Sequence, residues 1–409
     1  MIMRKKNLFI AGLAMVVPLL ANAANPVCDR VVDYVPAPGQ FVNILPEWEE
    51  GDDAESMASK AFTYMIPEEA MISLGAYGGY VTVGFDHTIV NADGRDLYIE
   101  GNAFQSDASA LSGGNSEPGI VMVAYDINGN GMPDDNEWFE IAGSEYSNSV
   151  RDYEITYYRP DADDTDIMWT DNKGNSGYVL RNVFHAQPYW PQWLADEPTL
   201  VFKGTRLPDN ATNEGTEDSP YFVLSRFDFG YADNYPNADS NGDWNEGAKI
   251  ELDWAVDCNG NTVKMPGVDF VRIYTGINQY NGWIGETSTE VCRVIDAHCS
   301  EVNGNLVLDE SLKMDETVLN EFIQRYPEGN LSSVQDIACN DAVRVYIDAS
   351  GTLVFSAVND GIAQIYDQSG RLMHYGKFNA GECSIDMSGY PSGLYIVNID
   401  GVSTKILKR

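Results

Sequence analysis

Residues 79–85 read Gly-Tyr-Val-Thr-Val-Gly-Phe, and apolar side chains alternate there with small or polar ones. A period of two places successive side chains on opposite faces of an extended strand. The pattern recurs between Gly, Asn and Asp turns in Asp96–Glu100, Gly119–Tyr125, Tyr153–Tyr158, Leu200–Lys203, Lys249–Trp254 and Val268–Tyr274. The chain is therefore predicted to be all-β and mainly antiparallel.

The order of these segments predicts the domain organisation. We expect residues 24–299 to form one jelly roll or β-sandwich, with the Pro- and Asn-rich stretch 168–218 as long loops over the sheet. Apolar spacing predicts short helices near 56–65 and 316–326, the second within a linker of residues 300–340. Four further alternating segments predict a small Ig-like β domain over 341–409: Val343–Ile347, Thr352–Phe355, Ile362–Tyr366 and Gly393–Ile399.

The first 23 residues have the three regions of a secretory signal peptide. Basic residues at Arg4-Lys-Lys6 precede an apolar run from Leu8 to Leu20, and Ala21-Asn-Ala23 follows. A lipoprotein would need a Cys directly after small residues, whereas Cys28 follows Asn25-Pro-Val27. No later stretch has the roughly 18 uninterrupted apolar residues of a transmembrane helix. We expect an exported protein with no membrane span.

The charge of the chain limits its partners. Acidic residues outnumber basic ones 62 to 25, giving a net charge of -37. Such a chain repels phosphate backbones, which excludes nucleic acid as a partner and favours divalent cations and cationic or neutral ligands. The same acidity also keeps an exported protein soluble, and the sequence does not separate the two roles.

One loop has the spacing of a calcium site. Residues 126–137 fit the pattern D-x-[DN]-x-[DN]-G-x5-E without a gap. Calcium takes six to eight hard oxygen ligands, which this spacing can wrap around one ion. The candidate ligands are Asp126, Asn128, Asn130, the carbonyl of Met132, Asp134 and Glu137. The alternative is an Asn-Gly hairpin turn without metal.

Catalytic motifs do not stand out. The four His residues have no zinc spacing, and the sequence contains no GxSxG, Walker loop or Rossmann glycine pattern. Two carboxylates would suffice for a glycosidase, but 62 acidic residues make any such choice arbitrary. We expect a protein that is not an enzyme.

Aromatic residues on loops are the candidates for ligand binding. The run 184–193 combines large rings with two prolines and lacks strand periodicity, and a second aromatic cluster precedes Glu286-Thr-Ser-Thr-Glu290. Rigid rings on loops form platforms for sugars or planar ligands. The candidates are Tyr189, Trp190, Trp193, Tyr280 and Trp283. The alternative is that these rings belong to the core.

The C-terminal segment resembles a known export signal. Ile365-Tyr-Asp-Gln-Ser-Gly-Arg-Leu372, Met387-Ser-Gly-Tyr-Pro-Ser-Gly-Leu-Tyr-Ile396 and the basic end Lys405-Ile-Leu-Lys-Arg409 are similar to the C-terminal sorting domain of the type IX secretion system of Bacteroidetes. The resemblance implies delivery to the cell surface or the extracellular space, with the secretion machinery as a partner. An ordinary Ig-like stability module is the alternative.

A second resemblance covers roughly residues 30–300. The segments 71–86, 99–104, 116–121, 143–146, 227–233, 253–257, 268–276 and 283–290 are similar to bacterial cell-surface proteins of jelly-roll type, some of which resemble proteins encoded beside vitamin B12 uptake systems. The resemblance implies a corrinoid or a similar nutrient as ligand, but it assigns no ligand residue. The expected function is a calcium-stabilised surface protein that binds a small nutrient. The alternative is a carbohydrate-binding or adhesive surface module.

Overall fold

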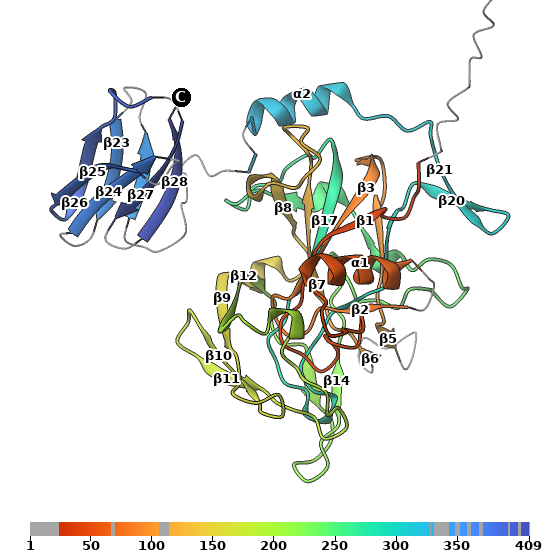
Figure 1. Ribbon diagram of the computed structural model, residues 1–409. Helices are drawn as coiled ribbons and strands as arrows, with labels where there is room; N and C mark the ends of the chain where they lie inside the picture. Colours follow the sequence, from red (N-terminus) through yellow and green to blue (C-terminus); the bar gives the residue numbers. More distant parts are fainter. Residues whose placement is uncertain are drawn as a thin grey trace, which may run out of the picture.

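The computed structural model describes residues 24–66, 70–105, 114–327, 329–330, 343–347, 352–357, 361–367, 371–391, 393–399 and 402–408. The expected signal peptide, 1–23, lies outside these residues. Strands dominate the described chain, which confirms the all-β class (Figure 1). Its α-helices, within that described part, are α1 (Ala54–Met65) and α2 (Glu316–Arg325), where apolar spacing predicts them.

A six-stranded antiparallel sheet forms the centre of the main body. The stretch that reveals the fold, 79–85, lies at the start of its longest strand, β3. The strand order is β1-β3-β17-β7-β8-β16. The bounds are Arg30–Val35 for β1, Tyr80–Val90 for β3, Gly267–Thr275 for β17, Gly119–Ala124 for β7, Trp138–Ile141 for β8 and Ala255–Val256 for β16.

The alternation along β3 creates two cores, one on each face of this sheet. Val81 and Val83 point into the first core, which α1 and a three-stranded sheet complete. Tyr80 packs on the second core, shared with a four-stranded sheet. The smaller sheets are β15 (Lys249–Ile250), β4 (Leu97–Glu100) and β19 (Arg293–Asp296) for the first core, and β11 (Ser176–Val179), β10 (Ile167–Asp171), β9 (Val150–Tyr158) and β12 (Thr199–Arg206) for the second.

Helix α1 begins with a capping box. The Asp53 carboxylate accepts a hydrogen bond from the Ser56 backbone N–H, and the Ser56 hydroxyl oxygen accepts one from the Asp53 N–H. These two bonds satisfy backbone donors that an isolated helix would leave unpaired. Met57, Ala61 and Met65 follow at intervals of four residues and are buried in the first core.

Helix α2 packs onto the main body, although the sequence places it in a linker. Phe322 is buried, and its ring centroid lies 5.5 Å from that of Phe139 on β8. Tyr326 contacts the same ring at 5.1 Å. Beyond the helix, the Asn330 side-chain amide donates to the Trp138 carbonyl at 2.8 Å. Residues 316–327, 329 and 330 are therefore part of the first core and its rim.

Four two-stranded sheets complete the described part of the main body. Three of them surround the candidate site: β2 (Ile72–Ser73) with β18 (Glu290–Val291), β5 (Phe104–Gln105) with β6 (Gly114–Asn115), and β13 (Ala211–Asn213) with β14 (Phe222–Leu224). The fourth is the hairpin of β20 (Cys299–Val302) and β21 (Asn305–Leu308).

The C-terminal region forms a separate set of strands with its own core. One sheet has the order β22-β23-β26, and the other has the order β25-β24-β27-β28. Phe355, Ile365 and Val397 are among the buried residues between them. The bounds are Val343–Ile347 for β22, Thr352–Ala357 for β23, Gly361–Asp367 for β24, Leu372–Phe378 for β25, Gly381–Asp386 for β26, Gly393–Ile399 for β27 and Val402–Lys408 for β28.

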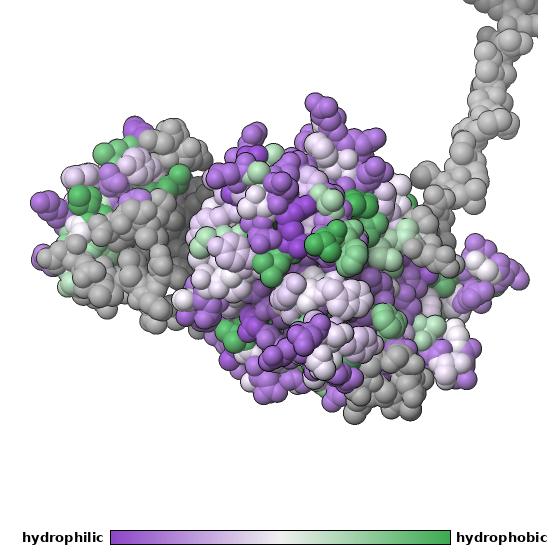
Figure 2. Space-filling model, turned by 90° about the horizontal axis from the view of Figure 1, so that it is seen from below, coloured by the Kyte–Doolittle hydropathy of each residue, from purple (hydrophilic) through white to green (hydrophobic). Residues whose placement is uncertain are grey.

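Within the described residues, the helices are too short or too polar to cross a membrane. Hydrophilic residues cover much of the face seen in Figure 2, where smaller hydrophobic patches lie between them. This surface agrees with the strong excess of acidic over basic residues.

Candidate functional site

A cavity of about 930 Å³ opens among the small two-stranded sheets, and we call it the aromatic cavity. Four of its rings remain largely open to solvent: Phe184 is 76% exposed, Phe104 57%, Trp283 57% and Tyr221 56%. Large apolar side chains are normally withdrawn from water, and a cluster of exposed ones marks an interaction site. The volume lies in the range of small-molecule sites.

Loops far apart in the chain bring these rings together. Trp283 lies in a short 3₁₀ helix, η6 (Gly282–Ile284), and its carbonyl accepts a hydrogen bond from the Asn182 side-chain amide at 2.6 Å. Gly282 has a φ of +66°, and a Cβ there would lie 2.6 Å from the Phe222 ring. Glycine is therefore required for the turn that presents Trp283.

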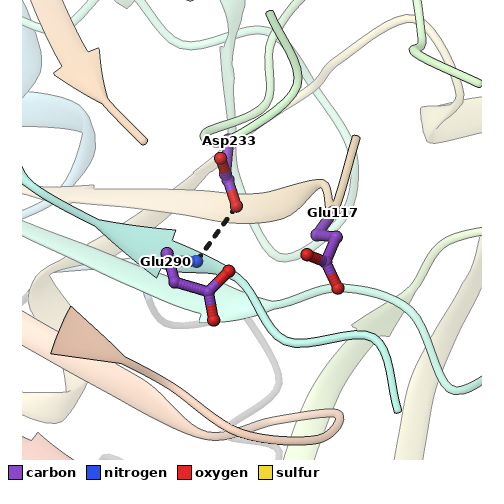
Figure 3. A group of neighbouring side chains, drawn as sticks. All are labelled: Glu117, Asp233 and Glu290. Atoms are coloured by element: carbon purple, nitrogen blue, oxygen red, sulfur yellow. Dashed lines mark hydrogen bonds between the residues drawn. The ribbon is translucent and has the colours of Figure 1, made fainter. Parts of the chain in front are cut away.

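Three buried carboxylates lie close to one another, and we call them the acidic cluster: Glu117, Asp233 and Glu290 (Figure 3). One oxygen of each lies within 4.8 Å of those of the other two. Glu117 and Glu290 line the cavity. Residues buried to this degree are seldom acidic unless a partner compensates the charge.

The backbone holds the cluster together. Glu117 precedes β7, and its N–H donates to the Asp233 carbonyl at 3.0 Å. Glu290 begins β18 and pairs with Ser73 of β2. Asp233 has a positive φ of 49°, which non-glycine residues seldom adopt. This conformation turns its carboxylate towards the N–H groups of Asn102 and Ala103, which donate to Oδ1 at 2.7 and 2.8 Å.

The Glu117 carboxylate is fixed on both oxygens. The Ser288 backbone N–H donates to Oε1 at 3.0 Å, and the Asn115 side-chain amide donates to Oε2 at 2.9 Å. The Ser288 hydroxyl in turn shares a 2.8 Å hydrogen bond with Ser73. The floor of the cavity is thus a preorganised polar layer under an aromatic rim.

Burial raises the pKa of every carboxyl in the cluster, and the charges of neighbouring carboxylates add to this effect for Glu117 and Glu290. Desolvation, followed by the charge of Asp233, raises the pKa of Glu117 to about 8. Desolvation raises the pKa of Asp233 to about 7. The pKa of Glu290 is raised well above its usual range by desolvation and then by Glu117 and Asp233. The cluster therefore holds protons near neutral pH unless a positive charge replaces them.

This arrangement has two chemical capacities. In the ionised state, the carboxylates only accept hydrogen bonds, so they bind donors or cations. In the protonated state, a carboxyl at the floor can also give its proton to a bound group.

The structure brings two of the predicted aromatic residues to this region. Trp283 lines the aromatic cavity. Tyr280 is 49% exposed and lies with Trp283 and Phe184 in an adjoining hollow of about 150 Å³. Phe184, which opens the aromatic run 184–193, lines both spaces.

The other three predicted aromatic residues lie elsewhere. Tyr189 and Trp190 are buried in the second core, where the indole N–H of Trp190 donates to the Leu194 carbonyl at 3.0 Å. Trp193 is partly buried and stacks on Tyr34 at 5.8 Å between ring centroids. Tyr189 and Trp190 thus belong to the core, which was the alternative interpretation, because the proline-rich loop folds back onto the sheet.

The calcium-type loop connects β7 to β8. Asp126 accepts hydrogen bonds from the backbone N–H groups of Asn130 at 3.0 Å and Gly131 at 2.7 Å. Glu137 is buried and accepts from the N–H groups of Ile127 at 2.9 Å and Asp134 at 3.1 Å. The loop therefore wraps around its own first and last acidic residues.

Three of the remaining candidate ligands, Asn128, Asn130 and Asp134, are linked by hydrogen bonds. The side-chain amides of Asn128 and Asn130 both donate to Asp134 Oδ2, at 2.5 and 2.9 Å. Gly129 and Gly131 have positive φ, which permits the tight turn before Met132. The set is rich in hard oxygen donors and fits calcium chemistry, although these hydrogen bonds also close the turn without an ion.

Sequence reasoning missed the acidic cluster. Glu117, Asp233 and Glu290 lie in the segments 116–121, 227–233 and 283–290 that carry the second resemblance, but that resemblance assigns no ligand residue and the three follow no catalytic or metal motif. The signal that could have found them is the position of each carboxylate beside a short apolar segment, at 117 before Gly119–Tyr125 and at 233 after Tyr231-Ala232.

One comparison with known proteins is informative. Residues 341–409 match the family model of the secretion system C-terminal sorting domain. The match identifies the C-terminal strands as a sorting domain of the type IX system and indicates export to the cell surface or the extracellular space. No curated protein matches the chain.

Proposed function

We propose that this exported protein binds a small nutrient in the aromatic cavity. The observation that carries the proposal is the ring of four exposed aromatic side chains around a space of about 930 Å³. Flat, rigid side chains provide contact area at a low cost in conformational entropy. The preorganised floor supplies polar groups that orient a ligand, as small-molecule sites require.

A corrinoid is one candidate nutrient, favoured by the resemblance to proteins encoded beside vitamin B12 uptake systems. A corrinoid has a large, flat macrocycle with amide side chains. The exposed rings of Trp283 and Phe184 suit such a face, and Asn102, Asn115 and Asn182 offer amide partners along the cavity wall.

The alternative is a carbohydrate-binding or adhesive surface module. The same combination of rings and Asn side chains supports it, because sugar rings stack on aromatic faces while their hydroxyls bond to amides. A glycan binder would be retarded in affinity gels that contain the polysaccharide, whereas a corrinoid binder would shift the absorption spectrum of cobalamin.

We also propose that calcium in the loop 126–137 stabilises the main body. Its hard-oxygen donors and its position between β7 and β8 of the central sheet support this role. Bound ions that stabilise only the folded state raise the free energy of unfolding.

Calorimetric titration of the full chain with cyanocobalamin in calcium buffer tests the proposal. We expect binding by the wild type and its loss in Trp283→Ala. Tyr178→Ala is the matched control, because this exposed ring on β11 lies outside the aromatic cavity. Absence of both heat and a spectral shift would remove the corrinoid, and glycan arrays would then test the alternative.

A further inference from the structure

The polar floor of the aromatic cavity consists largely of hydrogen-bond acceptors. Glu117 and Glu290 contribute carboxylates, and Gln40 contributes an amide group. Gln40 is 5% exposed, and no described donor reaches its buried Oε1. An orphaned acceptor at this depth loses the hydrogen bond it would make to water, which costs free energy until a donor arrives. Gln40 is thus an unpaired acceptor in the lining of the aromatic cavity, which a donor group of a ligand could satisfy.

The described chain supplies no compensating cation at this floor. Among the described residues that line the cavity there is no Lys or Arg, and the imidazole of His185 packs edge-on against Phe41 at 4.7 Å. The charges that act on Glu290 are those of Glu117, Asp233 and Glu286, all of one sign. Buried like charges without a counter-ion are unfavourable, so a positive ligand group would be strongly favoured there.

We infer that the aromatic cavity takes an organic cation, with an ammonium group on Glu117 and Glu290 and a flat or apolar body against Trp283. This inference rests on the proposed function and narrows its ligand to an amine-bearing nutrient, which it favours over a corrinoid. An ammonium group donates hydrogen bonds to several acceptors at once, and ring faces attract it as well.

A bare divalent ion fits these observations less well. Both oxygens of Glu117 and both of Asp233 already accept hydrogen bonds. Calcium needs six to eight oxygen ligands around one point, whereas the acidic cluster brings together one oxygen from each of three carboxylates. A bare ion would also leave the exposed rings of Trp283 and Phe184 without a partner.

Three probes that share an indole ring test the charge requirement: tryptamine carries an ammonium group, N-acetyltryptamine a neutral amide, and indole-3-propionate a carboxylate. Calorimetry or ligand-observed NMR with the full chain at pH 8 measures each affinity. We expect tryptamine to bind at least about tenfold more tightly than N-acetyltryptamine, a difference typical of one charge-assisted contact. Indole-3-propionate should bind most weakly.

Matched variants identify the residue that causes the preference for the ammonium-bearing probe. Glu290→Gln should bring the affinities for tryptamine and N-acetyltryptamine close together, whereas Glu217→Gln, at an exposed site, should preserve the difference. If Glu290→Gln does not fold, as judged by circular dichroism, Glu117→Gln serves the same purpose. Trp283→Ala should weaken all three probes, because it removes the platform and leaves the charges.

The outcomes separate this inference from the proposed function. Equal affinity for tryptamine and its neutral analogue would overturn the organic cation and leave the aromatic cavity as a binding site. No binding of any indole probe would count against the cavity itself. If calcium raised the melting temperature of the wild type but not that of Glu290→Gln, and tryptamine raised neither, the acidic cluster would be a metal site. This result would also overturn the inference.

Discussion

The backbone N–H of Glu290 donates a 3.0 Å hydrogen bond to Oδ2 of Asp233, and this bond uses the main chain of Glu290 and not its carboxyl group. One acidic residue is thus fixed through its carboxylate and the other through its main chain. Because the two are held by different atoms, Glu290 can change its protonation or its partner without releasing Asp233.

Stability should fall as the acidic cluster ionises. The pKa of Glu117 is raised to about 8 and that of Asp233 to about 7, and Glu286 and Glu290 add negative charge around them. A raised carboxyl pKa contributes stability that is complete below the unfolded value, near pH 4, and is lost as pH rises through 7 to 8. We expect the melting temperature of the ligand-free chain to drop by roughly 5 °C between pH 6 and 8.5.

The variant Glu290→Gln identifies the source of that drop, because its neutral amide removes one of the repelling charges. The pH dependence between 6 and 8.5 should become shallower in thermal melts. If the melting temperature of Glu290→Gln fell with pH as steeply as that of the wild type, other groups would cause the loss of stability.

A His–Asp network should weaken in alkali. His298 Nδ1 lies 2.9 Å from Asp296 Oδ1, and its other nitrogen lies 3.3 Å from Asp96. Burial opposes the charged imidazole, but Asp296 and Asp96 outweigh it and raise the pKa of His298 to about 9. The stabilisation is therefore complete below about pH 6.5 and is lost as pH rises through 9.

Replacing this histidine tests the network. His298→Gln should be less stable than the wild type at pH 6 by about 1–3 kcal/mol, and the difference should shrink by pH 10. Urea denaturation at both pH values gives the comparison. A difference that grew with pH would contradict the assignment of a charged imidazole.

Chelation should destabilise the main body. EDTA should lower the melting temperature of the wild type, because it removes an ion bound only by the folded loop. Asp126→Ala should abolish this sensitivity, whereas Asp239→Ala, in an exposed acidic turn, should keep it. Insensitivity of the wild type, together with no calcium in elemental analysis, would support the metal-free turn.

Helix α2 should behave as part of the core. Phe322→Ala removes a buried ring that contacts Tyr125 and Phe139, and such truncations cost about 3–5 kcal/mol. Glu321→Ala, one position earlier on the exposed side, should change stability by less than about 0.5 kcal/mol. Urea denaturation measures both, and equal values would mean that the helix is a loose linker.

Local patterns predicted the strands and helices but not the site. The alternation in Tyr80–Val83 reflects a sheet with two buried faces, and spacing alone was enough to predict α2. The apolar spacing did not predict the contact of Phe322 with Phe139, because the apolar face of a helix does not specify which residues it packs against.

The acidic cluster depends on contacts between distant segments. Asp233 and Glu290 are 57 residues apart, and the bond between Ser288 and Glu117 joins positions 171 residues apart. Period and composition carry no information about such pairs. The loop around Tyr189 also lacks periodicity. Its burial depends on packing against the sheet, which the local sequence does not reveal.

The contacts of Asn330 with the segment before β8 determine where a pulling force on the chain would first reach the main body. Its backbone N–H donates to the Asn136 carbonyl at 2.5 Å, and its side chain holds the Trp138 carbonyl. A pull on the chain beyond Asn330 would load these two bonds, together with the bond from the Cys258 N–H to Asn330 Oδ1, before it reaches α2. The calcium-type loop, which contains Asn136, would then bear the pulling force before the rest of the main body does.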